Sequence, residues 1–224
     1  MHILAKSKKK TLANEAYDYL KEKIIIGEIK PGNIITEKNV GDLLGMSRTP
    51  VKNALTKLEL ENYVKCIPGV GTVVTGLSFK DLKDIYDVRA SLECLALKSA
   101  IYNINKEDIN KLREEFKEGL KKYNEKGKIG PLDITDIDSS FHNLIIKNSQ
   151  NNYIEKLMDV IANQVSRYQI QAYTLTDTFE ESIQQHLKIL NSIENNNLDE
   201  AEDLLKAHIY WSYSELSKVI TNID

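Results

Sequence analysis

Three histidines and one aspartate in the C-terminal part of the chain are the residues best suited to bind a metal ion. Asp138 and His142 are four positions apart, so they share one face of a helix. His186 and His208 lie on two later segments with helical periodicity. One carboxylate and three imidazoles that converge inside a helix bundle could hold a divalent transition metal with open coordination positions. Spacing alone favours the alternative, three separate core or surface histidines.

A second group of candidate residues lies on residues 46–59. Ser47 is a good helix N-cap, because its hydroxyl can accept a hydrogen bond from a backbone N–H of the first turn. Val51, Leu55 and Leu58 recur at helical spacing and should face a core. A short helix with a polar, basic outer side suits the DNA major groove, whereas an ordinary amphipathic surface helix is the alternative. The outward residues are Arg48, Thr49, Lys52, Asn53 and Thr56.

The flanks of this stretch predict a winged helix-turn-helix. Helices are expected at residues 12–27 and 37–44, and Gly45-Met46 makes a tight connection into the helix at 46–59. Strand candidates at 63–67 and 72–75 enclose a turn with two glycines. A β-hairpin directly after a helix-turn-helix forms the wing of a DNA-binding domain.

From residue 77 onward the pattern is helical. The connections between the amphipathic segments are short and polar, which predicts an antiparallel all-helical bundle. Gly76 to Ser78 marks a boundary, so we expect domains at residues 1–76 and 77–224. The expected helices are 78–101, 105–125, 134–147, 153–172, 177–193 and 198–220. The residues expected to face inward on the first of them are Leu82, Ile85, Val88, Leu92, Leu95 and Ala96.

Composition and charge narrow the function. The 224 residues are 42% hydrophobic and 28% charged, as in ordinary globular proteins, with no apolar run of membrane-helix length and no signal-peptide core. Cys66 and Cys94 are expected as buried thiols rather than a disulfide framework, which favours a cytoplasmic protein. Residues 1–76 hold 12 Lys and Arg against 8 Asp and Glu, a net charge of +4, while residues 77–224 hold 18 against 25, a net of −7. A basic N-terminal part fits nucleic-acid binding at one end.

The order and spacing of several blocks resemble the GntR family of bacterial transcription regulators, in the FadR subfamily with a helical FCD effector domain. The resemblance covers nearly the whole chain. In the first domain the blocks are Ile26–Gly32, Met46–Lys52 and Gly69–Val74; in the second they are Val88–Glu93, Asp138–His142 and Gln185–Leu190, with Ala201 and His208. The resemblance implies a mostly α protein, with an N-terminal winged helix-turn-helix and a C-terminal antiparallel FCD-type bundle.

The resemblance also implies site residues and partners. It points to operator DNA contacts by Lys38, Ser47, Arg48, Thr49, Lys52 and, in the wing, Gly71. It implies a metal ion on Asp138, His142, His186 and His208, with zinc expected first and nickel or manganese as alternatives. A small carboxylate effector would meet Arg89 and Arg167, although a salt bridge is the plain alternative for each arginine. A homodimer on a two-fold symmetric operator is expected, without membrane contact.

The sequence departs from the usual family pattern at two places, and two other functions are alternatives to a metabolite-controlled regulator. Lys52-Asn53 stands where the family usually has Arg-Glu, and lysine lacks the fork that binds guanine at two points. Asn62 replaces a usual glycine, and asparagine tolerates a left-handed backbone. A regulator in which the metal itself is the signal is one alternative, and a metal-dependent hydrolase is another. Because no acidic residue is clearly placed as a general base, we do not expect an enzyme. Repression is the more common mode in the resembled family, so we expect a repressor.

Overall fold

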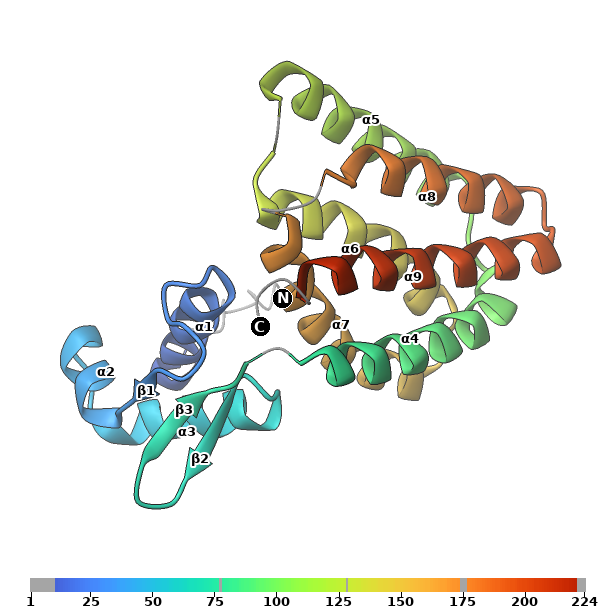
Figure 1. The fold of residues 1–224 in the computed structure, drawn as a ribbon. Coiled ribbons are helices and arrows are strands. Elements are labelled where there is room, and N and C mark those ends of the chain that lie inside the picture. Colours follow the sequence, from blue (N-terminus) through green and yellow to red (C-terminus); the bar gives the residue numbers. More distant parts are fainter. Residues whose placement is uncertain (1–10, 77, 128, 174–176, 221–224) are drawn as a thin grey trace, which may run out of the picture. The chain divides into compact units, whose positions relative to one another are not determined.

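The computed structural model describes residues 11–76, 78–127, 129–173 and 177–220. Its contacts divide the chain into two compact units, Met1–Gly76 and Leu77–Asp224. Each unit has its own cluster of buried hydrophobic side chains. The predicted fold class is confirmed, because the chain is mostly helical with a small antiparallel sheet in the first unit (Figure 1). None of the described helices is long and apolar enough to cross a membrane.

The first unit is a winged helix-turn-helix. Its elements are α1 (Leu12–Ile25), β1 (Ile34–Ile35), α2 (Glu37–Leu44), α3 (Arg48–Leu60), β2 (Val64–Ile67) and β3 (Gly71–Val74). The strands form an antiparallel sheet in the order β1-β3-β2, in which Ile34 pairs with Val73 and Val64 pairs with Val74. The short strand β1 lies outside the predicted hairpin, because two residues are too few to show an alternating pattern.

Local chemistry explains where these helices begin and how α2 meets α3. Thr11 and Thr36 cap α1 and α2, each accepting a backbone N–H with its hydroxyl. Gly45 ends α2 with a left-handed φ of 65°. A Cβ at Gly41 would lie 2.8 Å from the carbonyl oxygen of Met46, so only glycine permits this close approach of α2 to the turn.

The second unit is a helical bundle. Its elements are α4 (Phe79–Ala100), α5 (Lys106–Lys126), α6 (Pro131–Asn148), α7 (Asn152–Tyr173), α8 (Phe179–Glu194) and α9 (Leu198–Ile220). Helix α9 lies between α4 and α8, and α6 packs against α4, α5, α7 and α8 (Figure 1). Three of the most deeply buried core side chains, Tyr86, Phe116 and Phe141, are aromatic. A break between the fourth and fifth helices of this unit is expected at residues 173–176; α7 runs to Tyr173, and residues 174–176 lie outside the described residues.

Two predictions about burial were wrong. Val88 and Leu95 on α4, expected inward, are 49% and 54% exposed. Helix α4 is apolar on more than one side, so its sequence does not show which side meets the core. Cys66 was expected to be buried and is exposed on β2, whereas Cys94 is buried on α4. Cys66 points to the same face of β2 as the buried Val64, but it lies two residues nearer the hairpin turn, where the strand is exposed.

Candidate DNA-reading surface and metal centre

The predicted DNA-contact side chains of α3 lie on its outer side. Val51, Leu55 and Leu58 are buried as predicted, together with Ala54. The side chains of Ser47, Arg48, Thr49 and Lys52 are all exposed, as is Lys38 in the first turn of α2. Within the described chain, Lys38, Arg48 and Lys52 form no ion pair. These cations are therefore available to a ligand.

Ser47 occupies the N-cap position of α3, as predicted, but the predicted hydrogen bond is not formed. Its backbone is extended, with φ −70° and ψ 167°, and its hydroxyl makes no capping hydrogen bond. By contrast, the N-cap threonines of α1 and α2 do make this bond. The hydroxyl of Ser47 is therefore not used to cap α3, so helix capping does not explain a serine at this position.

Backbone conformation explains two positions near the wing. Asn62 adopts a φ of 59°, which confirms that asparagine takes the left-handed conformation between α3 and β2. Gly71 has a φ of 123°, and a Cβ there would lie 3.2 Å from the Cγ2 atom of Ile34. Glycine is thus required at position 71 by the hairpin itself, whether or not DNA contacts it.

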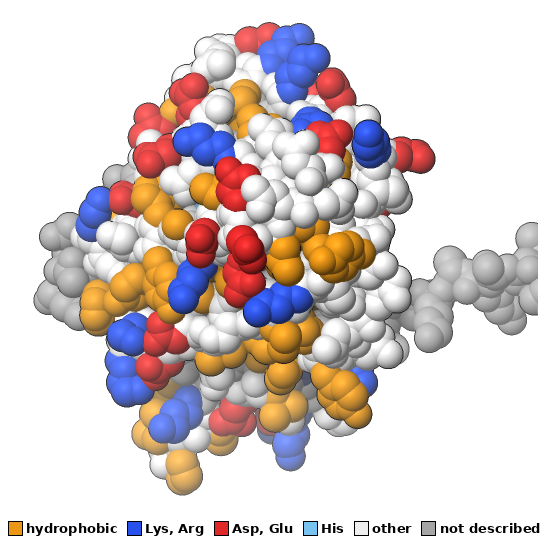
Figure 2. Space-filling view, turned by 90° about the vertical axis from the view of Figure 1, so that its right-hand side faces the viewer, with side chains coloured by type: hydrophobic (Ala, Val, Ile, Leu, Met, Phe, Trp, Pro, Cys, Tyr) orange, Lys and Arg blue, Asp and Glu red, His pale blue; other side chains and the backbone are white. Residues whose placement is uncertain are grey.

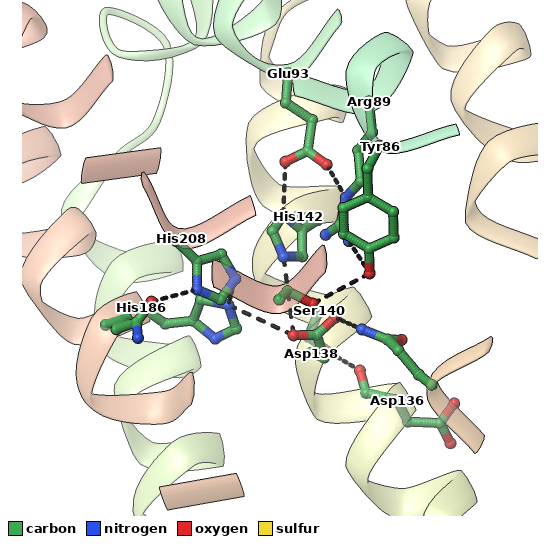
Figure 3. A network of polar contacts seen from close by, with 12 residues as sticks. Tyr86, Arg89, Glu93, Asp136, Asp138, Ser140, His142, His186 and His208 are labelled. Carbon is green, nitrogen blue, oxygen red and sulfur yellow. Dashed lines mark hydrogen bonds and ion pairs between the residues drawn. The ribbon is translucent and has the colours of Figure 1, made fainter. Parts of the chain in front are cut away.

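In the second unit the four predicted metal ligands meet inside the bundle. One ligand atom from each of Asp138, His142, His186 and His208 lies within 4.8 Å of the other three. Asp138 and His142 come from α6, while the other two histidines come from α8 and α9 (Figure 3). All four residues are buried, and no histidine shows on the face drawn in Figure 2. The alternative of three separate histidines is therefore excluded.

The distances between ligand atoms leave a hollow lined by nitrogen and oxygen. The Oδ1 atom of Asp138 lies 3.9 Å from Nε2 of His142 and 3.6 Å from Nε2 of His186, too far for hydrogen bonds. The Nε2 atoms of His186 and His208 are 2.9 Å apart. Two nitrogens bound at about 2.1 Å to one ion would be about 3.0 Å apart at a right angle and about 3.4 Å apart at the tetrahedral angle of zinc. The residues present thus fit a divalent ion.

Hydrogen bonds on the outer nitrogens turn two lone pairs toward this hollow. Nδ1 of His142 lies 2.6 Å from Oε2 of Glu93, and Nδ1 of His208 lies 3.0 Å from Oε1 of Gln185 (Figure 3). Because both oxygens accept, each Nδ1 carries the proton and each Nε2 keeps a lone pair. Among the described residues, buried Nε2 of His142 and buried Nδ1 of His186 have no hydrogen-bond partner.

Aromatic rings pack against the imidazole of His186, whose Nε2 is hydrogen-bonded to His208 but whose Nδ1 has no hydrogen-bond partner among the described residues. Its imidazole stacks on Phe141 at 4.1 Å between ring centroids and on Phe116 at 5.6 Å. Trp211, the only tryptophan of the chain, lies 5.9 Å from the ring of His208. The site therefore has an intrinsic fluorophore beside one of its histidines.

A chain of charges continues outward from His142. Glu93 also accepts a 2.6 Å hydrogen bond from Nε of Arg89, and both residues are fully buried on α4. Burial would raise the pKa of Glu93, but the neighbouring His142 and Arg89 outweigh it and lower the pKa to about 2. Gln169 on α7 donates to the other oxygen of Asp138 at 2.8 Å. Glu93 is therefore an ionised carboxylate that orients a candidate ligand.

The protonation of the candidate ligands suits a metal ion. Burial lowers the pKa values of His186 and His208 well below 6.5, so both imidazoles are neutral at pH 7. Burial would raise the pKa of Asp138, but the neighbouring His142 and Arg89 reverse this and lower it. Neutral imidazoles and an ionised carboxylate are the forms that bind metal.

A small cavity adjoins the cluster between α4, α6 and α7. Its polar lining includes Arg89, Asp138 and His142, and its apolar side includes Met158 and Val165. Arg167 was predicted to share the effector site, but it is 1% exposed and is not among the described residues that line the cavity. The structure thus brings Arg89 to the cluster and leaves Arg167 elsewhere in the core.

Sequence reasoning assigned no role to Glu93, Gln169 and Gln185, which hydrogen-bond three of the four candidate ligands, His142, Asp138 and His208 respectively. Glu93 follows Arg89 by four positions, which indicates an ion pair on one helix face. Its contact with His142 spans 49 residues and has no local signal. Gln185 directly precedes His186 but contacts His208 instead, so adjacency in the sequence would mislead.

Comparison with known proteins identifies both units. Residues 12–74 match the gntR family of bacterial regulatory proteins, and residues 84–210 match the FCD domain. The chain is 26% identical over 204 residues to the uncharacterized HTH-type transcriptional regulator YdhC of Bacillus subtilis (strain 168), covering 91% of this chain and 90% of that protein. It is 31% identical over 155 residues to the gluconate operon transcriptional repressor of the same strain, covering 67% and 60%.

The solved structure of E. coli McbR/YncC has the same fold, with a TM-score of 0.76 at 24% identity, over 94% of this chain and 99% of that chain. The matched families and these relatives are regulators of transcription rather than enzymes. The chain is therefore a transcriptional regulator that belongs to the gntR family and carries an FCD domain.

Proposed function

We propose that this regulator, of the FadR subfamily, binds a double-stranded DNA operator with its first unit. Helix α3 would enter the major groove, with Arg48 on a guanine edge and Lys38 and Lys52 on phosphates. Ser47 and Thr49 would bind phosphates at the start of α3, and Gly71 would let the wing approach the backbone. The free hydroxyl of Ser47 and the unpaired cations support this proposal.

Arg48→Ala tests the DNA contact. We expect this variant to lose roughly 1–3 kcal/mol of specific binding, measured by fluorescence anisotropy at fixed salt on DNA selected by the native chain. Lys57→Ala is a matched control, because Lys57 lies 3.7 Å over the ring of Tyr17, on the flank of α3 opposite Arg48 and Lys52. Unchanged affinity of the Arg48 variant would remove that residue from the interface.

In the second unit we propose a divalent metal held by Asp138, His142, His186 and His208, with zinc first and nickel or manganese as alternatives. The observation that carries this proposal is the buried Nε2 of His142, which has no hydrogen-bond partner among the described residues and lies 3.9 Å from Oδ1 of the ionised Asp138. Unsatisfied buried polar atoms are destabilising, and a cation would satisfy Nε2 of His142 directly. When bound, the ion supplies positive charge and open positions for an oxygen ligand.

The effector we propose is a small carboxylate. Glu93 and Asp138 bring two negative charges to this region and Arg89 brings one positive charge. A divalent cation would reverse the sign of that sum, so an anion would be attracted only to the metal-loaded site. The cavity has about 30 Å³ open to the centres of water-sized molecules, room for only a few heavy atoms without movement of its walls.

Helix α7 could relay binding at this cavity to the beginning of the second unit. It lines the cavity with Met158 and Val165, and Gln169 bonds Asp138. Next to Gln169, the Tyr168 hydroxyl donates a 3.0 Å hydrogen bond to the carbonyl of Ser78, the N-cap of α4. A ligand that displaced α7 would therefore pull on the first described residue after the domain boundary. Such a ligand changes DNA affinity only if it binds the two arrangements differently.

We also propose a homodimer through exposed apolar side chains of α4 and its neighbour α7. Val88 and Leu95 on α4, and Tyr102 in the turn just after it, recur every seven residues and are 49%, 54% and 72% exposed. On α7, Tyr153 and Leu157 are 78% and 54% exposed. Apolar residues at this density on a surface favour association, and a two-fold dimer would match a symmetric operator. Repression in the cytoplasm is the proposed mode, because a relative is named a repressor.

One titration tests the metal and effector proposals together. The chelated protein is titrated with Zn²⁺ or Ni²⁺ while Trp211 fluorescence is recorded, and operator affinity is measured with and without metal and a panel of small carboxylates. A carboxylate-dependent change in affinity only with metal supports the proposal. A change with metal alone would favour a metal sensor, and turnover of an acid would favour an enzyme. His142→Ala is titrated in the same way as a control. If the native chain takes up no more metal than this variant, the metal site is refuted.

A further inference from the structure

The centre of the outer side of α3 is set by the residues that are buried. Val51, Ala54, Leu55 and Leu58 face the core of the first unit. At about 100° per residue, the side directly opposite carries Thr49, Asn53, Thr56 and Leu60, which recur at intervals of four, three and four. All four of these side chains are exposed. Arg48 and Lys52 lie to one flank of this line.

Of these four residues, Asn53 alone offers both a donor and an acceptor near the middle of the helix. The hydroxyl of Thr56 donates to the backbone carbonyl of Lys52 at 3.1 Å, so its proton is already used within the helix. Leu60 is 77% exposed but has no polar side-chain atom. The side-chain amide of Asn53 has no hydrogen-bond partner in the described part of the chain.

The charges around Asn53 permit close approach to DNA. The first turn of α3 has no acidic residue. Glu59 lies near the far end of the helix, where Oε1 accepts the backbone N–H of Cys66 at 2.6 Å. Helix α3 therefore presents its basic N-terminal half to a polyanion without like-charge repulsion.

We propose that Asn53 determines specificity by reading an adenine in the major groove. The first residues of a recognition helix, such as Arg48, can reach base edges from its N-terminus, and a residue near mid-helix on the side that faces the groove, such as Asn53, meets the base edges further along. The amide oxygen of Asn53 would accept from N6 of adenine, and its NH₂ group would donate to N7. This assignment rests on the proposed placement of α3 in the groove. It does not depend on the metal or the effector.

Selection from a pool of random double-stranded DNA, with the full chain, tests the assignment. The native chain should enrich a consensus with a strongly preferred A·T pair. Asn53→Ala should lose the preference at that position and keep the others, and Asn53→Glu should move it toward C·G, because a carboxylate accepts from N4 of cytosine. Thr56→Val is the matched control, since it removes a hydroxyl already used within the helix, and it should keep the native consensus.

The affinities then decide the outcome. On the native consensus, replacing the A·T pair should weaken the native chain roughly tenfold and leave Asn53→Ala unchanged. If Asn53→Ala enriches no sequence, its affinity is measured at lower salt on the native consensus with each of the four base pairs at the A·T position. Equal affinity for all four base pairs supports the assignment. Retained discrimination by Asn53→Ala would overturn it. A native chain that enriches no sequence would instead refute the placement of α3 in the groove, and the assignment with it.

Discussion

Glu93→Gln is the change that most directly tests how the candidate metal centre is organised. The Glu93 carboxylate accepts two hydrogen bonds, one from Nδ1–H of His142 and one from Nε–H of the charged Arg89 guanidinium, each at 2.6 Å. A glutamine of the same size keeps one oxygen for one donor. Its NH₂ group then faces the other donor, so one hydrogen bond is replaced by a repulsive contact. The change also leaves the Arg89 guanidinium buried without its counter-charge.

The expected magnitudes follow from burial. Glu93 is 0% exposed and Arg89 is 3% exposed, so water cannot compensate for the lost charge. Removing one member of a buried ion pair lowers the free energy of unfolding by about 3–5 kcal/mol. Loss of the carboxylate behind a metal-binding imidazole weakens metal affinity by about 10- to 100-fold. Both effects should therefore be large enough to measure separately.

The assay pairs urea unfolding with Zn²⁺ competition against a chelating indicator. Glu202→Gln is the matched control on the same unit, since Glu202 lies 3.5 Å from Lys98 and the two side chains are 32% and 54% exposed. That variant should lose at most about 1 kcal/mol of stability and no zinc affinity. If Glu93→Gln does not fold, Glu93→Asp keeps the charge at a greater distance and should bind zinc more weakly than the native chain. Native zinc affinity in a folded Glu93→Gln protein would refute the role given to this carboxylate.

Three further predictions concern the second unit. Leu95→Arg should shift the molecular mass measured by light scattering toward the monomer, whereas Leu132→Arg, at a similarly exposed leucine of α6, should not; equal masses would move the dimer interface elsewhere. Tyr168→Phe should keep zinc affinity but speed amide hydrogen exchange in the first turn of α4, and unchanged exchange would remove this residue from the relay. In chelated protein the free energy of unfolding should fall as the pH drops below 6.5, because the unfolded chain binds the proton that buried His186 excludes. His186→Phe should reduce the slope of free energy against pH by up to about 1.4 kcal/mol per pH unit. An equal slope in both proteins would contradict this prediction.

Local patterns in the sequence were enough for the helices, the wing and the domain boundary. Caps, glycines and a period of 3.6 residues act within a few positions, so the start of α3 at Ser47 was predictable from its neighbours alone, whereas the left-handed Asn62 was expected because the family usually has glycine there. The four candidate metal ligands were found through a family resemblance. Their spacing favoured separate histidines, because residues on three helices converge only after the bundle has formed.

The tertiary structure decided which side of α4 is buried and which side chains hydrogen-bond the candidate ligands. Helix α4 is apolar on more than one side, and only packing against α6, α7 and α9 leaves Val88 and Leu95 outside. Glu93 contacts His142, which is 49 residues away in the sequence. Gln185 contacts His208 rather than His186, the residue that follows it. Such contacts depend on how whole helices are placed, which no local periodicity encodes.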